Sequence, residues 1–180
     1  MIRLRDVAAA AVALALGSIP AAAQRVPASA GDSASQSVPQ LIANIERKHP
    51  VTFYVLAQRL FEAGQRDEAV FWFYAGQIRY RAYLKHNPRL DPSGDPALFA
   101  SLSEVIGRPI NEYAFGHVPS LAAAIDHALA WDAAHADPYA PKGAAEREQV
   151  VEGLRKMKAQ VLASADDIRK QRSVNGLENR

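Results

Sequence analysis

Apolar residues recur at helical spacing from residue 40 onward, and no segment alternates apolar and polar residues in the manner of a half-buried strand. Stretches rich in proline and glycine interrupt this periodicity and are expected to be irregular connections, at residues 86–96, 107–119 and 136–143. The periodicity predicts a short helix around residues 41–45 and longer helices at residues 51–63, 66–85, 97–106, 120–135 and 144–170. The chain is therefore expected to be all-α, a compact bundle of five or six helices.

The helix expected at residues 66–85 carries four successive aromatic residues, Phe71 to Tyr74. Because successive helical residues are turned by about 100°, these four side chains cannot share one face. An angular map of the whole segment has apolar residues on two sides, with a glutamine and two arginines in the gaps. Nine of the chain's 14 aromatic residues lie between Phe53 and Tyr83. The aromatic run is therefore expected to be buried between neighbouring helices, with Phe73 near the centre of the core.

The helices expected at residues 51–63 and 66–85 are joined at Gly64, which suits the left-handed position that ends a helix. The stretch FYVLAQRLFEAGQRDEAVFWFYAG resembles a tetratricopeptide-type hairpin or its SEL-like relative. The residues that match the family's pattern are Phe53, Leu56, Ala57, Leu60, Gly64, Ala69, Phe73 and Gly76. The proline that usually closes the repeat is absent, and no second copy follows at a step of about 34 residues. The resemblance implies a single hairpin at the centre of the bundle, with protein or peptide binding and no catalytic residue.

The first 23 residues have the order of a secretory signal peptide: a basic start, ten apolar residues and three alanines before Gln24. Ten apolar residues are too few to span about 30 Å of hydrocarbon. Export to the periplasm is therefore expected, with no transmembrane segment in the mature chain. Residues 24–39 are rich in serine, alanine and proline and are expected to be a flexible linker. Residues 40–172 are expected to form the helical domain, and residues 173–180 a disordered tail.

Composition argues against several classes of function. The chain has no cysteine, and its net charge of +2 is too small for a surface that neutralises many phosphates, so nucleic acid is not an expected partner. There is no glycine-rich phosphate loop and no G-x-S-x-G motif. His127 and His135 are about 12 Å apart along a helix, too far to bind one metal ion. We therefore predict no catalytic residue, no cofactor and no metal site.

Two segments are candidates for partner binding, because arginine and tyrosine dominate binding hot spots and long connections often carry binding groups. The first is a basic edge on the aromatic helix, and the second is the connection at residues 107–119. The predicted partner-binding residues are Arg79, Tyr80, Arg81, Arg108, Asn111, Glu112 and Tyr113. In the alternative structural interpretation, the arginines pair with nearby acids, Tyr113 fills the core, and Asn111 and Glu112 cap the backbone.

The predicted function is that of an exported domain that binds another protein or peptide, as a monomer or a weak dimer. An immunity-type protein that occupies a delivered toxin and an envelope adaptor both fit this description. The alternative is an enzyme with a dispersed acid/base site around Arg108, Glu112 and His117, which requires Glu112 and His117 to converge in a pocket. A third possibility is a small ligand held between helices by Tyr80, Tyr83 and Trp131.

Overall fold

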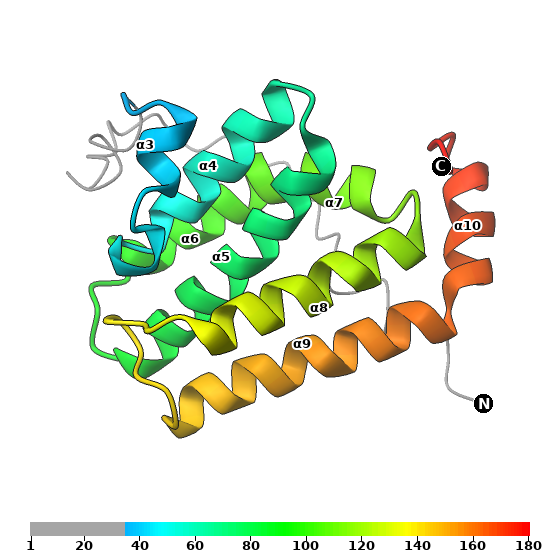
Figure 1. Cartoon of the computed structure of the whole chain (residues 1–180). Coiled ribbons are helices and arrows are strands. Elements are labelled where there is room, and N and C mark those ends of the chain that lie inside the picture. Colours follow the sequence, from blue (N-terminus) through cyan, green and yellow to red (C-terminus); the bar gives the residue numbers. More distant parts are fainter. Residues whose placement is uncertain (1–34) are drawn as a thin grey trace.

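The computed structural model describes residues 35–180, and every regular element in that range is a helix (Figure 1). The elements are α3 (Val38–Ile42), the 3₁₀ turn η1 (Ile45–Arg47), α4 (Val51–Glu62), α5 (Arg66–His86), α6 (Asp95–Leu102), the π-helical turn η2 (Ser103–Gly107), α7 (Arg108–Ala114), α8 (Val118–Ala134), α9 (Ala145–Ala163) and α10 (Ala165–Val174). The predicted all-α bundle is confirmed. Within residues 35–180, no helix is both long enough and apolar enough to cross a membrane.

The first 34 residues lie outside the described part of the chain. The signal peptide expected at residues 1–23 is therefore untested, and so is most of the linker expected at residues 24–39. The last two residues of that linker, Val38 and Pro39, begin α3. Proline is accommodated there because the first turn of a helix does not need its N–H group.

The helix α5 is the centre of the bundle and contacts α4, α7, α8 and α9. Figure 1 shows α4 on one side of α5, with the antiparallel pair α8 and α9 on the other. All four aromatic residues from Phe71 to Tyr74 are buried, and Phe73 is only 1 % exposed. The prediction that this run is buried on more than one side is confirmed, because its neighbours cover both apolar sides of α5.

The turn between α4 and α5 stops the first helix with a glycine in the left-handed region. Gly64 has a φ of +80°, which a residue with a side chain rarely adopts. The N–H of Gly64 donates to the carbonyl of Phe61 (3.1 Å), and the N–H of Gln65 donates to the carbonyl of Leu60 (2.9 Å). This pair of hydrogen bonds is the Schellman arrangement, which satisfies carbonyls that the end of a helix leaves free. The hairpin predicted at this position is therefore present, with its ends within one residue of those expected.

Small residues let α4 and α5 approach closely. Ala57 and Ala69 are fully buried, and a Cβ atom added at Gly76 would lie 2.8 Å from the Cβ of Phe53. That separation is too short for two carbon atoms that are not bonded, so Gly76 is required at this crossing.

The connection expected at residues 107–119 is mostly helical, and that part of the prediction is wrong. The π-helical turn η2 carries the chain from α6 directly into α7, which covers Arg108–Ala114. Pro109 does not break this helix, because it lies in the first turn of α7. Gly107 is buried against Phe73, where an added Cβ would lie 2.9 Å from the ring. Packing against α5 therefore holds this segment in a helical path that its glycine and proline did not suggest.

The single long helix expected at residues 144–170 is two helices in the structure. The chain leaves helical geometry at Ser164, and α10 then turns away from the axis of α9 (Figure 1). The tail expected to be disordered is held in place, because the N–H of Arg180 donates to the carbonyl of Gly116 at 2.8 Å. The buried Arg172 donates to the carbonyl of Glu178 at 2.6 Å. The amphipathic period runs through the break, so the sequence pattern alone did not reveal it.

The surroundings of two helical glycines predict that substituting each with alanine changes stability in opposite directions. Gly76→Ala should destabilise the fold by about 1–3 kcal/mol, because the added methyl group overpacks the contact with Phe53. Gly153→Ala should stabilise it by about 0.5–1 kcal/mol, because Gly153 lies in α9 with no heavy atom within 4 Å of an added Cβ. Urea denaturation of both variants measures the two changes. If Gly76→Ala also stabilised the protein, the helices would not cross as closely as described.

Candidate functional site

Four buried charged side chains lie where α5, α8 and α9 meet: Arg79, Asp132, Asp137 and Arg147, each less than 10 % exposed. The Nε atom of Arg79 lies 2.7 Å from Oδ1 of Asp132, and its Nη1 atom lies 3.6 Å from Oδ1 of Asp137. The first of these is an ionic contact that lacks hydrogen-bond geometry. Arg147 pairs with both carboxylates as well, at 2.9 Å from Asp137. We call these four residues the charge quartet.

Arg79 has a second role at the end of α8. Its guanidinium donates to the carbonyls of His135 (3.0 Å) and Ala136 (2.7 Å), which follow the helix. It also lies 5.1 Å from the ring centroid of Trp131. Arginine is the residue best suited to such a position, since its planar fork of donors can satisfy carboxylates and carbonyls together. The charge quartet is thus a structural connection between helices and is closed to partners.

The prediction that Arg79 and Tyr80 contact a partner is wrong. They are 1 % and 0 % exposed, because α5 is covered on the sides where these residues lie. Arg81 is exposed, and its Nε donates to the side chain of Gln77 at 2.6 Å while its guanidinium lies over Phe99. Of these three residues, Arg81 alone is exposed.

The charge quartet predicts that two neighbouring arginines differ strongly in their contribution to stability. Arg79→Ala should lower the free energy of unfolding by about 3–5 kcal/mol, because it leaves two buried carboxylates with one cation. Arg81→Ala should change it by less than about 0.5 kcal/mol, because its side chain is on the surface. Thermal and urea denaturation check both values. Equal effects of the two substitutions would contradict the structural role given to Arg79.

A second polar cluster surrounds His49, just before α4. The His49 ring is in edge-to-face contact with Tyr80, Tyr83 and Tyr139, at centroid distances of 5.6, 5.3 and 5.2 Å. Its Nε2 atom lies 3.4 Å from a carboxylate oxygen of Asp95. The hydroxyl groups of Tyr80 and Tyr83 also donate to Asp95, at 2.6 and 3.3 Å. The cluster ties the start of α4 and the start of α6 to α5.

Burial dominates the electrostatics of this cluster. It lowers the pKa of His49, although the carboxylate of Asp95 acts in the opposite direction. It also raises the pKa of Tyr80, and the hydrogen bond to Asp95 adds to that rise. His49 is therefore neutral in the folded protein at pH 7. No helical pattern involves His49, so sequence reasoning had no signal for this cluster.

The lowered pKa of His49 makes stability depend on pH in a defined direction. In the unfolded chain His49 titrates near pH 6.5. Between its lowered folded pKa and that value, the unfolded state binds more protons, so stability should rise with pH and be lost as the pH falls below about 6.5. His49→Gln should reduce this slope, measured by urea denaturation from about pH 5 to pH 7.5. The matched control is His127→Gln on α8, and an unchanged slope in His49→Gln would contradict the prediction.

The residues of the alternative acid/base site are not brought together. Glu112 is exposed, and Arg108 pairs with Glu104 one turn away. The Nδ1 atom of His117 accepts a hydrogen bond from the Ser120 N–H (3.3 Å), so His117 caps the start of α8. Among the described residues, no hydrogen bond or ion pair joins Arg108, Glu112 and His117 to one another.

The remaining sequence-predicted residues, Asn111 and the three aromatic residues of the proposed small-ligand site, lie elsewhere in the fold. Asn111 accepts a hydrogen bond from the buried hydroxyl of Tyr74 at 3.0 Å, which is a structural role. The three aromatic residues expected to line a small-ligand site are not arranged around a common space: Tyr80 is fully buried, and Trp131 packs between Phe53 and His135. Residues 35–180 contain no group of three or more histidine, cysteine, aspartate or glutamate side chains suited to a metal ion.

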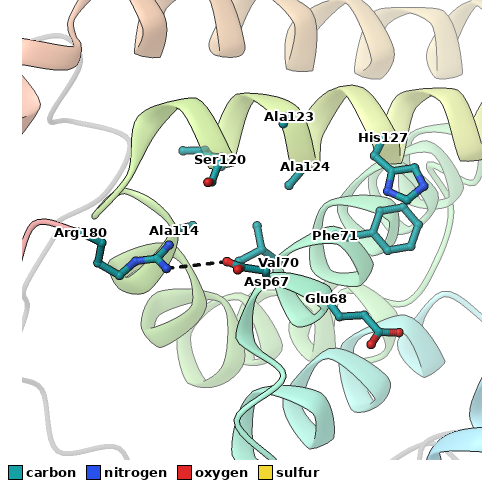
Figure 2. A pocket seen from close by; sticks show the side chains of 11 residues that line it. Asp67, Glu68, Val70, Phe71, Ala114, Ser120, Ala123, Ala124, His127 and Arg180 are labelled. Atoms are coloured by element: carbon teal, nitrogen blue, oxygen red, sulfur yellow. Dashed lines mark ion pairs between the residues drawn. The ribbon is translucent and has the colours of Figure 1, made fainter.

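The candidate binding surface is an open groove between the first half of α5 and α8, with a volume of about 430 Å³ (Figure 2). Alanines and other apolar side chains form much of its lining, and charged residues stand at its edges. The lining residues are Asp67, Glu68, Val70, Phe71, Ala114, Ser120, Leu121, Ala123, Ala124, His127 and Arg180. Phe71 stacks on His127 with the ring centroids 4.2 Å apart. We call this surface the α5–α8 groove.

One end of the α5–α8 groove is occupied by Arg180. Its Nη1 atom lies 3.7 Å from Asp67, and its guanidinium is 3.5 Å from the ring centroid of Tyr113 and hydrogen-bonded to the hydroxyl (Figure 2 shows the ion pair). The Tyr113 hydroxyl in turn donates to Asp67 at 2.9 Å. A second arginine, Arg66, lies 5.5 Å from the same ring. Tyr113 is therefore the one predicted binding residue from residues 107–119 that adjoins the groove.

Sequence reasoning missed the groove because its residues come from separate segments. Asp67 and Glu68 look like ordinary acids in the first turn of a helix, where the helix dipole favours them. Ala123 and Ala124 look like ordinary helix formers on α8. Only the packing of α8 across α5 places these residues around one concavity.

Comparison with known proteins adds one relative. No family model matches the chain, and no solved structure matches it significantly. An uncharacterised protein of Haemophilus influenzae is 36 % identical over 98 residues, which are 53 % of this chain and 36 % of that protein. The matched part is thus little more than a third of the relative's length. The chain is similar to part of that bacterial protein.

Proposed function

We propose that this chain is a helical domain that binds a segment of another protein or a peptide in the α5–α8 groove. The observation that carries the proposal is the groove itself, with its volume of about 430 Å³, apolar lining and charged edges. Binding sites commonly combine an apolar concavity with a few polar groups that set orientation.

The helices that form the groove are packed against other helices on their remaining sides. The helix α5 contacts five other helices, α4, α6, α7, α8 and α9, and the charge quartet connects its second half to α8 and α9. A site on rigid elements loses little conformational freedom when a ligand binds, which favours affinity. The α5–α8 groove therefore has the character of a preformed surface.

The likeness of α4 and α5 to a tetratricopeptide-type hairpin supports the same function, since that family binds proteins and peptides. We propose that the protein acts in the periplasm, because residues 1–23 have the order of a signal peptide. Cell fractionation tests this compartment, and recovery of the unprocessed chain in the cytoplasm would contradict it.

The proposal predicts that blocking the groove abolishes binding. A phage-displayed library of random peptides is selected on the purified protein, and the affinities of enriched peptides are measured by calorimetry. Ala123→Trp should weaken their binding about tenfold or more, because Ala123 lines the groove and the indole would fill it. Ala159→Trp, at another exposed alanine in the helix α9, is the matched control and should leave affinity unchanged.

Two results would contradict the proposed function. One is a selection that enriches no peptide. The other is a set of peptides whose affinity falls equally, or not at all, in the two tryptophan variants. Circular dichroism of both variants verifies that the helices remain folded.

A further inference from the structure

We infer that the α5–α8 groove binds a segment that presents an arginine or lysine side chain to Asp67 and Tyr113, in the place that Arg180 occupies in this structure. The inference rests on the proposed function and names the chemistry of the partner. It also assigns residues 175–180 the role of an internal competitor for that place.

The position of Arg180 shows how a cation is held there. Its guanidinium lies over the Tyr113 ring at 3.5 Å from the centroid, donates to the Tyr113 hydroxyl and lies 3.7 Å from Asp67. An aromatic face and a carboxylate together attract a cation more strongly than either does alone. The Tyr113 hydroxyl donates to Asp67 at 2.9 Å, which holds the aromatic ring and the carboxylate next to each other.

Hydrogen bonds and one exposed ion pair keep Arg180 in this place. Its N–H donates to the Gly116 carbonyl, and Arg172 donates to the Glu178 carbonyl. The Asn179 amide donates to the Arg169 carbonyl and the Ser173 hydroxyl. The side chains of Arg180 and Asp67 are 30 % and 76 % exposed. Ion pairs this exposed contribute little to stability, because water and salt screen them. A second cation with additional contacts in the groove can therefore replace Arg180.

The charges around the groove favour a basic partner once Arg180 is displaced. The described lining then has two carboxylates, Asp67 and Glu68, and no arginine or lysine. Arg66 lies nearby, 5.5 Å from the Tyr113 ring centroid, so the two carboxylates still outnumber this cation. Next to this acidic edge the lining is apolar, from Ala123 and Ala124 of α8 and the outer edges of the largely buried Val70 and Phe71. A basic residue followed by apolar residues complements this order of charges and apolar surface.

The test uses the peptides enriched by the phage selection and the full-length protein. The enriched sequences should share an arginine or lysine, and changing it to glutamine should weaken binding about tenfold. Asp67→Asn should weaken binding by a similar factor. The control is Asp166→Asn, because Asp166 is also the second residue of a helix but does not line the groove. Arg180→Ala should strengthen binding, since it removes the competitor.

The outcomes separate this inference from the function on which it rests. Peptides that are blocked by Ala123→Trp but lack a shared cation, or are indifferent to Asp67→Asn, would leave the proposed function intact and overturn this inference. Weaker binding to Arg180→Ala would show that Arg180 is part of the binding surface and would overturn its role as competitor. If no peptide is blocked by Ala123→Trp, both fail. Thermal denaturation confirms that each variant is folded.

Discussion

The helix α5 has apolar residues on two sides, and burying both of them is the constraint on which the remaining structure depends. One partner helix can cover only one side, so α4 on one side is matched by α8 and α9 on the other. Close packing on the α4 side requires Gly76 at the crossing, and the other side encloses Phe71 and Trp72. The aromatic run that first suggests a binding surface is in fact the core that orders the helices around it.

Covering α5 on several sides also buries the polar residues that lie between its apolar faces. An isolated arginine in such a place would be costly, because desolvating a charge takes several kcal/mol. The structure answers this with the charge quartet, in which two carboxylates and a second arginine leave no net charge. Buried networks of this kind depend on geometry, and the quartet joins Arg79 of α5 and Arg147 of α9 to Asp132 of α8.

The α5–α8 groove is what remains open after these requirements are met. Near the start of α5, the residues of α8 that face it are the small Ala123 and Ala124. Larger side chains would fill the space between the two helices, but these alanines leave a concavity. Tyr113, contributed by a helix that the sequence did not predict, brings an aromatic face to one end of this concavity. The candidate site is thus a consequence of how the core packs, and its charged residues belong to the start of α5 and to the segment after α10.

Local patterns in the sequence determined the helical class, the ends of α4 and α5 and the burial of the aromatic run. These features follow from a period of 3.6 residues and from the conformation of Gly64, both of which operate within a few residues along the chain. Only the tertiary structure decided that Arg79 is buried, that His49 meets Asp95, and that Asp67 shares a groove with Ala123. Each of these depends on the angle and register at which distant helices pack. Periodicity shows which face of a helix is apolar, but it does not show which residue of another helix lies opposite.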